Sequence, residues 1–269
     1  QLRKGCIVGI PEHPYSCSLA TSNICDRLEN AVVQAFAQMG EGFGMAECGS
    51  LLPPATGVIS GHDPRNDRYF VNEIFLFHTA AGASPDADGW LTLTGMGSAG
   101  LCLLDSVELD ELRFPMKVYK QEIYINSEGA GRRRGSPGAY VEFGPFGSNM
   151  KVAYASDGSH FPAAGVRGGG NASKAQQYKI DKFGKKINLP IVNEVELLEN
   201  ERIVSITQPG GGYGPPHERE LPRVQKDFLE GWITKKRAYE VYGVKFNTKG
   251  EINENETSIK RKLLKKKYN

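Results

Sequence analysis

Residues 116–156 read MKVYKQEIYINSEGAGRRRGSPGAYVEFGPFGSNMKVAYAS. Three runs within them, residues 116–126, 139–146 and 151–156, are rich in β-branched and aromatic residues. Glycine, proline and asparagine separate the runs, as they do where tight turns join strands. This part of the chain therefore predicts three short β-strands.

The same pattern continues on both sides of these residues. Further runs of strand-forming residues lie at 69–77, 90–96 and 191–198, and the 32 glycines of the chain concentrate in this region. Many short strands need many turns, and glycine supplies the backbone freedom that turns require. We predict an α+β fold dominated by mixed or antiparallel sheet between residues 69 and 207.

One helix is predicted before the strands, at residues 22–39, SNICDRLENAVVQAFAQM. Ser22 is a suitable N-cap, and a cluster of three glycines after residue 39 ends the helix. Apolar residues recur at the spacing of one helical face: Ile24, Leu28, Ala31, Val32, Ala35 and Met39. Because an apolar face normally meets a core, we expect this helix to pack on the sheet.

The C-terminal part predicts two short helices and a charged end. The helices are expected in PRVQKDFLEGW and TKKRAYEVYG, with Thr234 as the N-cap and Gly243 as the C′ residue of the second. The end, IKRKLLKKKYN, predicts a solvated tail, with a docking arm as the alternative. We divide the chain into a β-rich core (1–207), a glycine-rich loop with a two-helix appendage (208–246) and a basic tail (247–269).

Composition excludes several functional classes. Hydrophobic residues make up 39% and charged residues 24%, no apolar run approaches membrane-spanning length, and the net charge of +2 is too small to indicate nucleic-acid binding. The five cysteines show no CxxC spacing, which favours reduced thiols in the cytoplasm over disulfides or a zinc site.

Residues 127–138, SEGAGRRRGSPG, are the first candidate for chemistry. Glycines such as Gly129 and Gly131 expose backbone N–H groups, and the guanidinium groups of Arg132 and Arg134 suit phosphate or carboxylate. The segment is not a Walker A loop, because no Gly-Lys-Ser/Thr follows. The alternative is a tight turn between strands whose arginines form ion pairs.

Residues 208–219, QPGGGYGPPHER, are the second candidate. The loop glycines, Gly210, Gly211, Gly212 and Gly214, permit close approach by a ligand or by another chain segment. His217, Glu218 and Arg219 could supply acid–base or anchoring groups. The alternative is a loop that wraps another element, with surface ion pairs at its end.

Residues 105–115 are a weaker candidate, for metal binding. Glu108 and Glu111 could act as paired carboxylates or metal ligands, but such acids more often balance nearby arginines. The five histidines form no HxH or HxxxH pair. We therefore predict no metal site in this chain, and we find no nucleophile motif.

These segments, in this order, resemble the C-terminal half of the hydantoinase B-type subunits of hydantoinases, 5-oxoprolinases and acetone or acetophenone carboxylases. The resemblance rests on SLATSN and its following helix, VELDELRFP, NSEGAGRRRG, QPGGGYGPPHER and DFLEGWITKKRAYEVYGV, and it covers nearly the whole chain. Three positions depart from the family pattern: Ser106 replaces a proline, and Glu128 and Ser136 each replace a glycine.

The resemblance implies a subunit of an ATP-dependent hetero-oligomer that is inactive alone. A hydantoinase A-type partner would bind ATP and Mg²⁺ and phosphorylate a carbonyl or enol oxygen, and the intermediate would be hydrolysed (a cyclic amide) or carboxylated (a ketone). A second partner would be the N-terminal hydantoinase B-type half, expected as a separate chain. Any divalent metal would lie in that half or in another partner.

The resemblance names no catalytic residue here. From the loops we expect Arg132, Arg134, Glu218 and Arg219 to face substrate or phosphate, because arginine binds two oxygens at once. The alternative is a structural subunit that contributes no residue to the active site.

Overall fold

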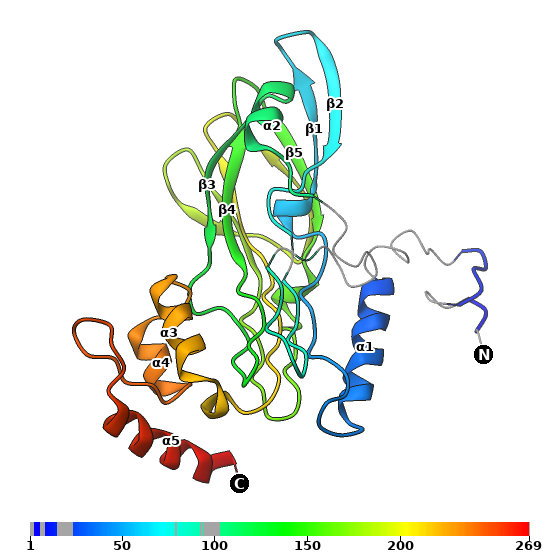
Figure 1. Cartoon of the computed structure of the whole chain (residues 1–269). Coiled ribbons are helices and arrows are strands. Elements are labelled where there is room, and N and C mark those ends of the chain that lie inside the picture. Colours follow the sequence, from blue (N-terminus) through cyan, green and yellow to red (C-terminus); the bar gives the residue numbers. More distant parts are fainter. Residues whose placement is uncertain are drawn as a thin grey trace.

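Two antiparallel sheets form the upper part of the molecule (Figure 1). The computed structural model describes residues 3–5, 9–14, 24–78, 80–91, 93 and 103–268. The first sheet has the strand order β2-β1-β5-β8: β2 (Arg68–Glu73), β1 (Val58–Asp63), β5 (Met150–Ala155) and β8 (Val192–Leu197). The second has the order β3-β4-β9-β6-β7: β3 (Met116–Ile123), β4 (Ala139–Pro145), β9 (Arg202–Ile206), β6 (Gln176–Ile180) and β7 (Lys186–Asn188).

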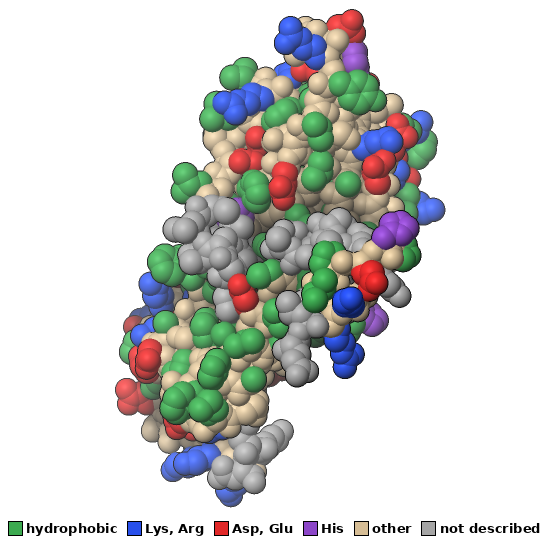
Figure 2. Space-filling view, turned by 90° about the vertical axis from the view of Figure 1, so that its right-hand side faces the viewer, with side chains coloured by type: hydrophobic (Ala, Val, Ile, Leu, Met, Phe, Trp, Pro, Cys, Tyr) green, Lys and Arg blue, Asp and Glu red, His purple; other side chains and the backbone are tan. Residues whose placement is uncertain are grey.

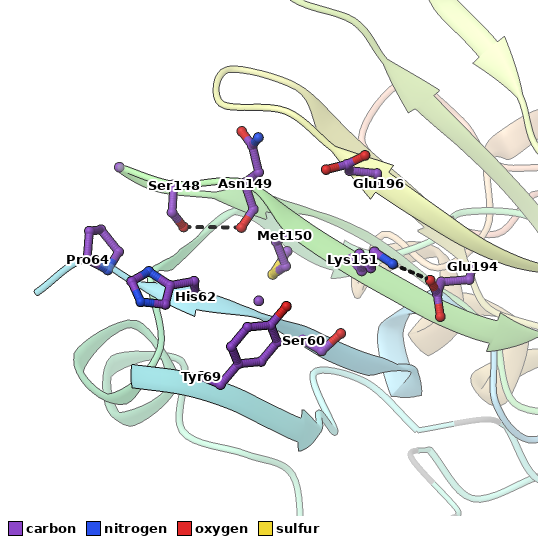
Figure 3. Close-up of a pocket in the computed structure, with 12 residues that line it drawn as sticks. Ser60, His62, Pro64, Tyr69, Ser148, Asn149, Met150, Lys151, Glu194 and Glu196 are labelled. Carbon is purple, nitrogen blue, oxygen red and sulfur yellow. Dashed lines mark hydrogen bonds and ion pairs between the residues drawn. The ribbon is translucent and has the colours of Figure 1, made fainter. Parts of the chain in front are cut away.

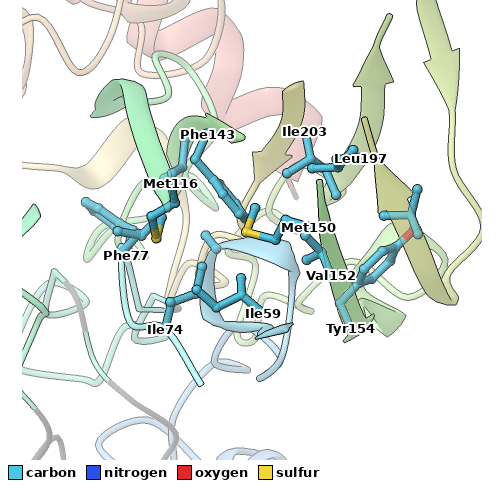
Figure 4. Close-up of a cluster of buried hydrophobic side chains, with 14 of the residues drawn as sticks. Ile59, Ile74, Phe77, Met116, Phe143, Met150, Val152, Tyr154, Leu197 and Ile203 are labelled. Carbon is cyan, nitrogen blue, oxygen red and sulfur yellow. The ribbon is translucent and has the colours of Figure 1, made fainter. Parts of the chain in front are cut away.

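The main core lies between the two sheets (Figure 4). Ile59, Val152 and Leu197 from the first sheet and Phe143 and Ile203 from the second are fully buried in one cluster. Their alternation with exposed residues gives each sheet one apolar face, and these two faces meet. The predicted α+β, sheet-dominated fold is confirmed, and its strands are antiparallel.

Five α-helices accompany the sheets in the described residues: α1 (Cys25–Ala37), α2 (Val107–Arg113), α3 (Leu221–Leu229), α4 (Lys235–Glu240) and α5 (Glu254–Tyr268). Short 3-10 turns occur at Pro54–Thr56, Asp157–Ser159 and Pro216–Glu218. Thr234 caps α4 as predicted, since its side chain accepts a hydrogen bond from the N–H of Arg237. No described helix has the length and apolar character needed to cross a bilayer.

The basic end of the chain is a helix and not a solvated tail. In α5 the side chains of Thr257 and Leu264 are buried, at 2% and 9% exposed. Arg261 donates hydrogen bonds to the carbonyl oxygens of Tyr242 (3.2 Å) and Arg219 (2.6 Å). These contacts hold the lysine-rich helix against the end of α4 and the 3-10 turn Pro216–Glu218.

Below the sheets, five extended segments lie side by side between α1 and the C-terminal helices (Figure 1): residues 45–49, 80–83, 129–136, 163–170 and 208–214. We call them the glycine bundle. Residues 208–214 run at its centre: Gly211 donates to the oxygen of Glu47 (2.8 Å) and accepts from Ala83 (2.9 Å), while Gly212 donates to Gly170 (3.0 Å). Backbone therefore packs directly on backbone across segments that are distant in the sequence.

The predicted helix exists, but its apolar face points outward (Figure 2). α1 packs through Asp26, Asn30 and Ala37, which are at most 3% exposed, whereas Leu28 and Met39 are 53% and 66% exposed. The expectation that the apolar face meets the sheet is wrong, because the inner surface of α1 contacts the polar backbone of the glycine bundle. The expected N-cap Ser22 lies outside the described residues, as does most of the strand expected at residues 90–96.

Candidate functional site

A cavity of about 230 Å³ opens where residues 208–214 leave the glycine bundle. It is lined by Glu41, Arg132, Arg167, Tyr213, Gly214, Pro215 and Glu218. Two of the four residues expected to bind phosphate or substrate, Arg132 and Glu218, thus share one cavity. The fold brings them together because the two glycine-rich loops are hydrogen-bonded neighbours in the bundle.

Backbone hydrogen bonds fix the position of Arg132 at this cavity. Its N–H donates to the oxygen of Gly214 (3.1 Å), and the neighbouring Arg133 and Tyr213 exchange two backbone hydrogen bonds (3.0 and 2.8 Å). Gly214 has a φ of 70°, and a Cβ there would lie 3.2 Å from Cβ of Arg132. A glycine at 214 therefore lets the arginine side chain lie directly over the loop.

The two arginines of the cavity keep donors free for a ligand. Arg132 forms an ion pair with Glu41 (2.6 Å), yet its buried Nε has no hydrogen-bond partner among the described residues. Arg167 is exposed, and its side chain has no hydrogen bond or ion pair with any described residue. Unpaired guanidinium donors at the wall of a cavity suit a carboxylate or phosphate oxygen.

Sequence reasoning missed Arg167. It stands in AAGVRGGGN and has a left-handed backbone with a φ of 55°, which residues other than glycine seldom adopt. An arginine followed by three glycines is the signal that could have identified it, since the same combination marked residues 127–138.

Arg134 and Arg219, the other two candidates, lie outside the cavity in a buried ion-pair network. Arg134 is paired with Asp227 (2.9 Å) and stacks on Trp232, with its guanidinium carbon 4.5 Å from the ring centre. Arg219, 1% exposed, is paired with Asp88 (2.6 Å) and with Asp227 (2.9 Å). Both guanidinium groups are occupied, so the geometry gives them the task of joining loops to helix α3.

Asp88 is the shared acid of this network. Burial alone would raise its pKa, but hydrogen bonds and charge from Arg219, with a further contribution from Arg134, outweigh burial and lower the pKa to about 2. The carboxylate is therefore held firmly in its charged form. This network connects residues 80–91, both glycine-rich loops and α3.

The remaining sequence candidates are placed apart from the cavity. His217 is 7% exposed, and burial lowers its pKa. Glu111 accepts a hydrogen bond from the N–H of Val118 (2.8 Å), and Glu108 accepts one from the Ser106 hydroxyl (2.8 Å). In the part of the chain that the structure describes, no three His, Cys, Asp or Glu side chains are grouped as metal ligands.

A larger, open hollow of about 510 Å³ lies on the outer face of the first sheet (Figure 3). Its charged side chains satisfy one another, with His62 paired to Asp67 (2.9 Å) and Lys151 to Glu194 (2.9 Å). None of the predicted candidates lines it. The smaller cavity at Arg132 is therefore the better candidate for chemistry.

Comparisons with known proteins agree with this architecture. The chain is 30% identical over 219 residues to the beta subunit of the caprolactamase of Pseudomonas jessenii, and this match covers 77% of the chain and 37% of that subunit. The crystal structure of the ATP-dependent caprolactamase from the same organism superposes with a TM-score of 0.70 at 26% identity, over 81% of this chain and 38% of that one. The chain thus spans well under half the length of these relatives.

Two further relatives were found. The B-type polypeptide of a putative D-/L-hydantoinase from Pseudomonas sp. (strain NS671) is 28% identical over 58% of this chain and 27% of its own length. A nucleotide-free acetone carboxylase shares the fold, with a TM-score of 0.65 at 19% identity over 83% of this chain and 34% of that one. The hydantoinase B/oxoprolinase family model matches residues 1–216, and the chain therefore belongs to the hydantoinase B/oxoprolinase family.

Proposed function

We propose that the chain is a subunit of an ATP-dependent complex that hydrolyses a cyclic amide through a phosphorylated intermediate. The observation that carries this proposal is its similarity, at 28–30% identity, to subunits of a caprolactamase and a putative hydantoinase. The likeness to acetone carboxylase, at 19% identity, supports the fold alone. Hydrolysis is therefore preferred to ketone carboxylation, the second candidate.

The division of labour follows from the residues present. This chain has no phosphate-binding loop of the Walker type, so ATP and Mg²⁺ are assigned to a hydantoinase A-type partner. Phosphorylation of the amide oxygen makes an unreactive amide open to attack by water. On this proposal the chain alone is inactive. Cys25 and Cys48 are free thiols, which fits a reducing cytoplasm.

The cavity residues would orient the substrate or its phosphorylated form. Arg132 and Arg167 offer guanidinium donors to the developing negative charge, and Glu218 offers an acceptor at the same cavity. Because the glycine bundle holds Arg132 by its backbone, this charge is positioned before substrate arrives.

The substrate class is tested with the assembled complex and two reaction mixtures. ATP with ε-caprolactam, hydantoin or 5-oxoproline should give ATP-dependent ring opening, and ATP with acetone and bicarbonate should give no carboxylated product. Carboxylation without ring opening would overturn the proposal.

The role of the cavity is tested by Arg132→Lys, which keeps the charge but loses the planar fork. We expect turnover to fall about ten-fold or more, roughly 1.4 kcal/mol per factor of ten, with unchanged assembly. Arg133→Lys is the matched control, because Arg133 is the adjacent arginine and pairs with Glu220 away from the cavity. Equal turnover by both variants would favour a structural subunit without active-site residues.

A further inference from the structure

Helix α1 presents an apolar outer face, where a surface helix normally carries charged residues. We define this face by its exposed residues: Leu28, Ala31, Val32, Ala35, Phe36 and Met39. The four large side chains among them are 48–66% exposed, and none of the six positions is ionisable. Figure 2 shows hydrophobic side chains gathered over α1 on this side of the molecule. Such a contiguous patch marks an interaction surface.

The outward orientation is specified by hydrogen bonds on the opposite face. The side-chain oxygen of Asn30 accepts from the N–H of Cys48 (2.7 Å), and its amide group donates to the oxygen of Asp26 (2.9 Å). Arg27 is paired with Glu47 of the glycine bundle. Rotating α1 to bury its apolar face would break these contacts and bury their partners unpaired.

The loop after α1 extends the face and anchors it. The hydroxyl of the fully buried Tyr213 accepts from the N–H of Gly42 (3.2 Å) and donates to the oxygen of Phe43 (3.1 Å). The Phe43 ring is 52% exposed and lies 3.8 Å from where a Cβ on Gly40 would be. The same central segment that shapes the Arg132 cavity thus holds this apolar face in place.

We propose that the outer face of α1 docks on an apolar surface of the remaining part of a hydantoinase B-type subunit. The proposal rests on the proposed function, and length identifies the occupant. The chain covers only 37% of the caprolactamase beta subunit, so most of that subunit lies outside the matched region. An uncharged face is typical of permanent interfaces, which resemble a core cut in half. Small Ala31 and Ala35 between larger residues also permit close helix packing.

Photo-crosslinking in the assembled complex tests the occupant. A benzophenone-bearing amino acid at Val32 should crosslink to the part of the hydantoinase B-type subunit that this chain does not contain. The same group at Phe183, which is 83% exposed far along the chain, is the control and should not reach that part. Crosslinks from position 32 to a second copy, to the ATP-binding subunit, or to nothing would overturn the proposal.

A charge on the face provides the second test. Val32→Glu should leave the melting temperature of the isolated chain unchanged and weaken association at least ten-fold. Val71→Glu, at a valine that is 71% exposed on β2, is the matched control and should associate normally. Normal association of Val32→Glu would also overturn the proposal.

The two proposals fail separately. If position 32 crosslinks elsewhere in a complex that opens a cyclic amide, the docking proposal fails and the proposed function stands. If docking occurs as expected but no ATP-dependent reaction is found, the proposed function fails alone.

Discussion

Glu128 shows what one side chain does in a glycine-rich loop. It is 1% exposed, pairs with Arg237 of α4 (2.7 Å) and accepts a hydrogen bond from the Tyr242 hydroxyl (2.9 Å). Burial raises its pKa, and the charge and hydrogen bond of Arg237 oppose that rise. The residue departs from the family pattern at this position, where it connects the first glycine-rich loop to the C-terminal helices.

At the residue scale we predict strong coupling between Glu128 and Arg237. Arg237→Met leaves a buried carboxylate without its partner, so it should lower the free energy of unfolding by about 3–5 kcal/mol. Adding Glu128→Leu removes the stranded charge and should restore part of that loss. Urea unfolding of the wild type, both single variants and the double variant measures the coupling. Additive losses would show that the two side chains act independently.

At the element scale, the sequence predicted strands where β-branched runs are bounded by turn residues, as at β3, β4 and β5. It missed β1, because a glycine inside the short run VISGHD weakens the strand pattern. It also missed α2, where Ser106 caps the helix by accepting from the N–H of Leu109. For α1 the periodicity identified the helix and its apolar face correctly. It could not tell the direction of that face, because direction depends on what the rest of the fold offers.

The glycine bundle supplies the prediction at this scale. A Cβ on Gly210 would lie 1.9 Å from the oxygen of Ala81, whereas a Cβ on Gly170 would meet its nearest atom, the oxygen of Ala130, at 3.4 Å. Gly210→Ala should therefore lower the free energy of unfolding by about 3 kcal/mol or more. Gly170→Ala, in the same bundle, should change it by less than about 1 kcal/mol. Equal denaturation midpoints would contradict the close backbone contact at Gly210.

At the scale of the whole molecule, the buried ions near Asp88 tie together regions that the sequence keeps apart. Sequence reasoning found the right loops and half of the cavity, since Arg132 and Glu218 meet there. It could not separate Arg132 from Arg134, two positions away, because burial and partners come from tertiary contacts with Asp88 and Asp227. It missed Arg167 because its backbone conformation is set by the surrounding bundle.

This network predicts how stability depends on acid. The pKa of Asp88 is lowered from 3.8 to about 2, so its contribution is fully present above pH 3.8 and is lost as the pH falls toward 2. The shift corresponds to about 2 kcal/mol, at about 1.4 kcal/mol per pKa unit. The stability gap between wild type and Asp88→Asn should therefore narrow between pH 4 and pH 2 in chemical denaturation. Asp67→Asn, at a carboxylate that is 95% exposed, should show no such narrowing.

The central position of residues 208–214 also governs how the chain reaches its native state. This segment bonds to neighbours that precede it by long stretches of sequence, such as Glu47, Ala83 and Gly129. Contacts of such high contact order form slowly, because long loops must close before any hydrogen bond rewards them. During synthesis the bundle cannot be completed until residue 214 has left the ribosome. Until then the earlier segments wait with their backbone groups exposed to water, which makes this stage of folding the one in greatest need of chaperones.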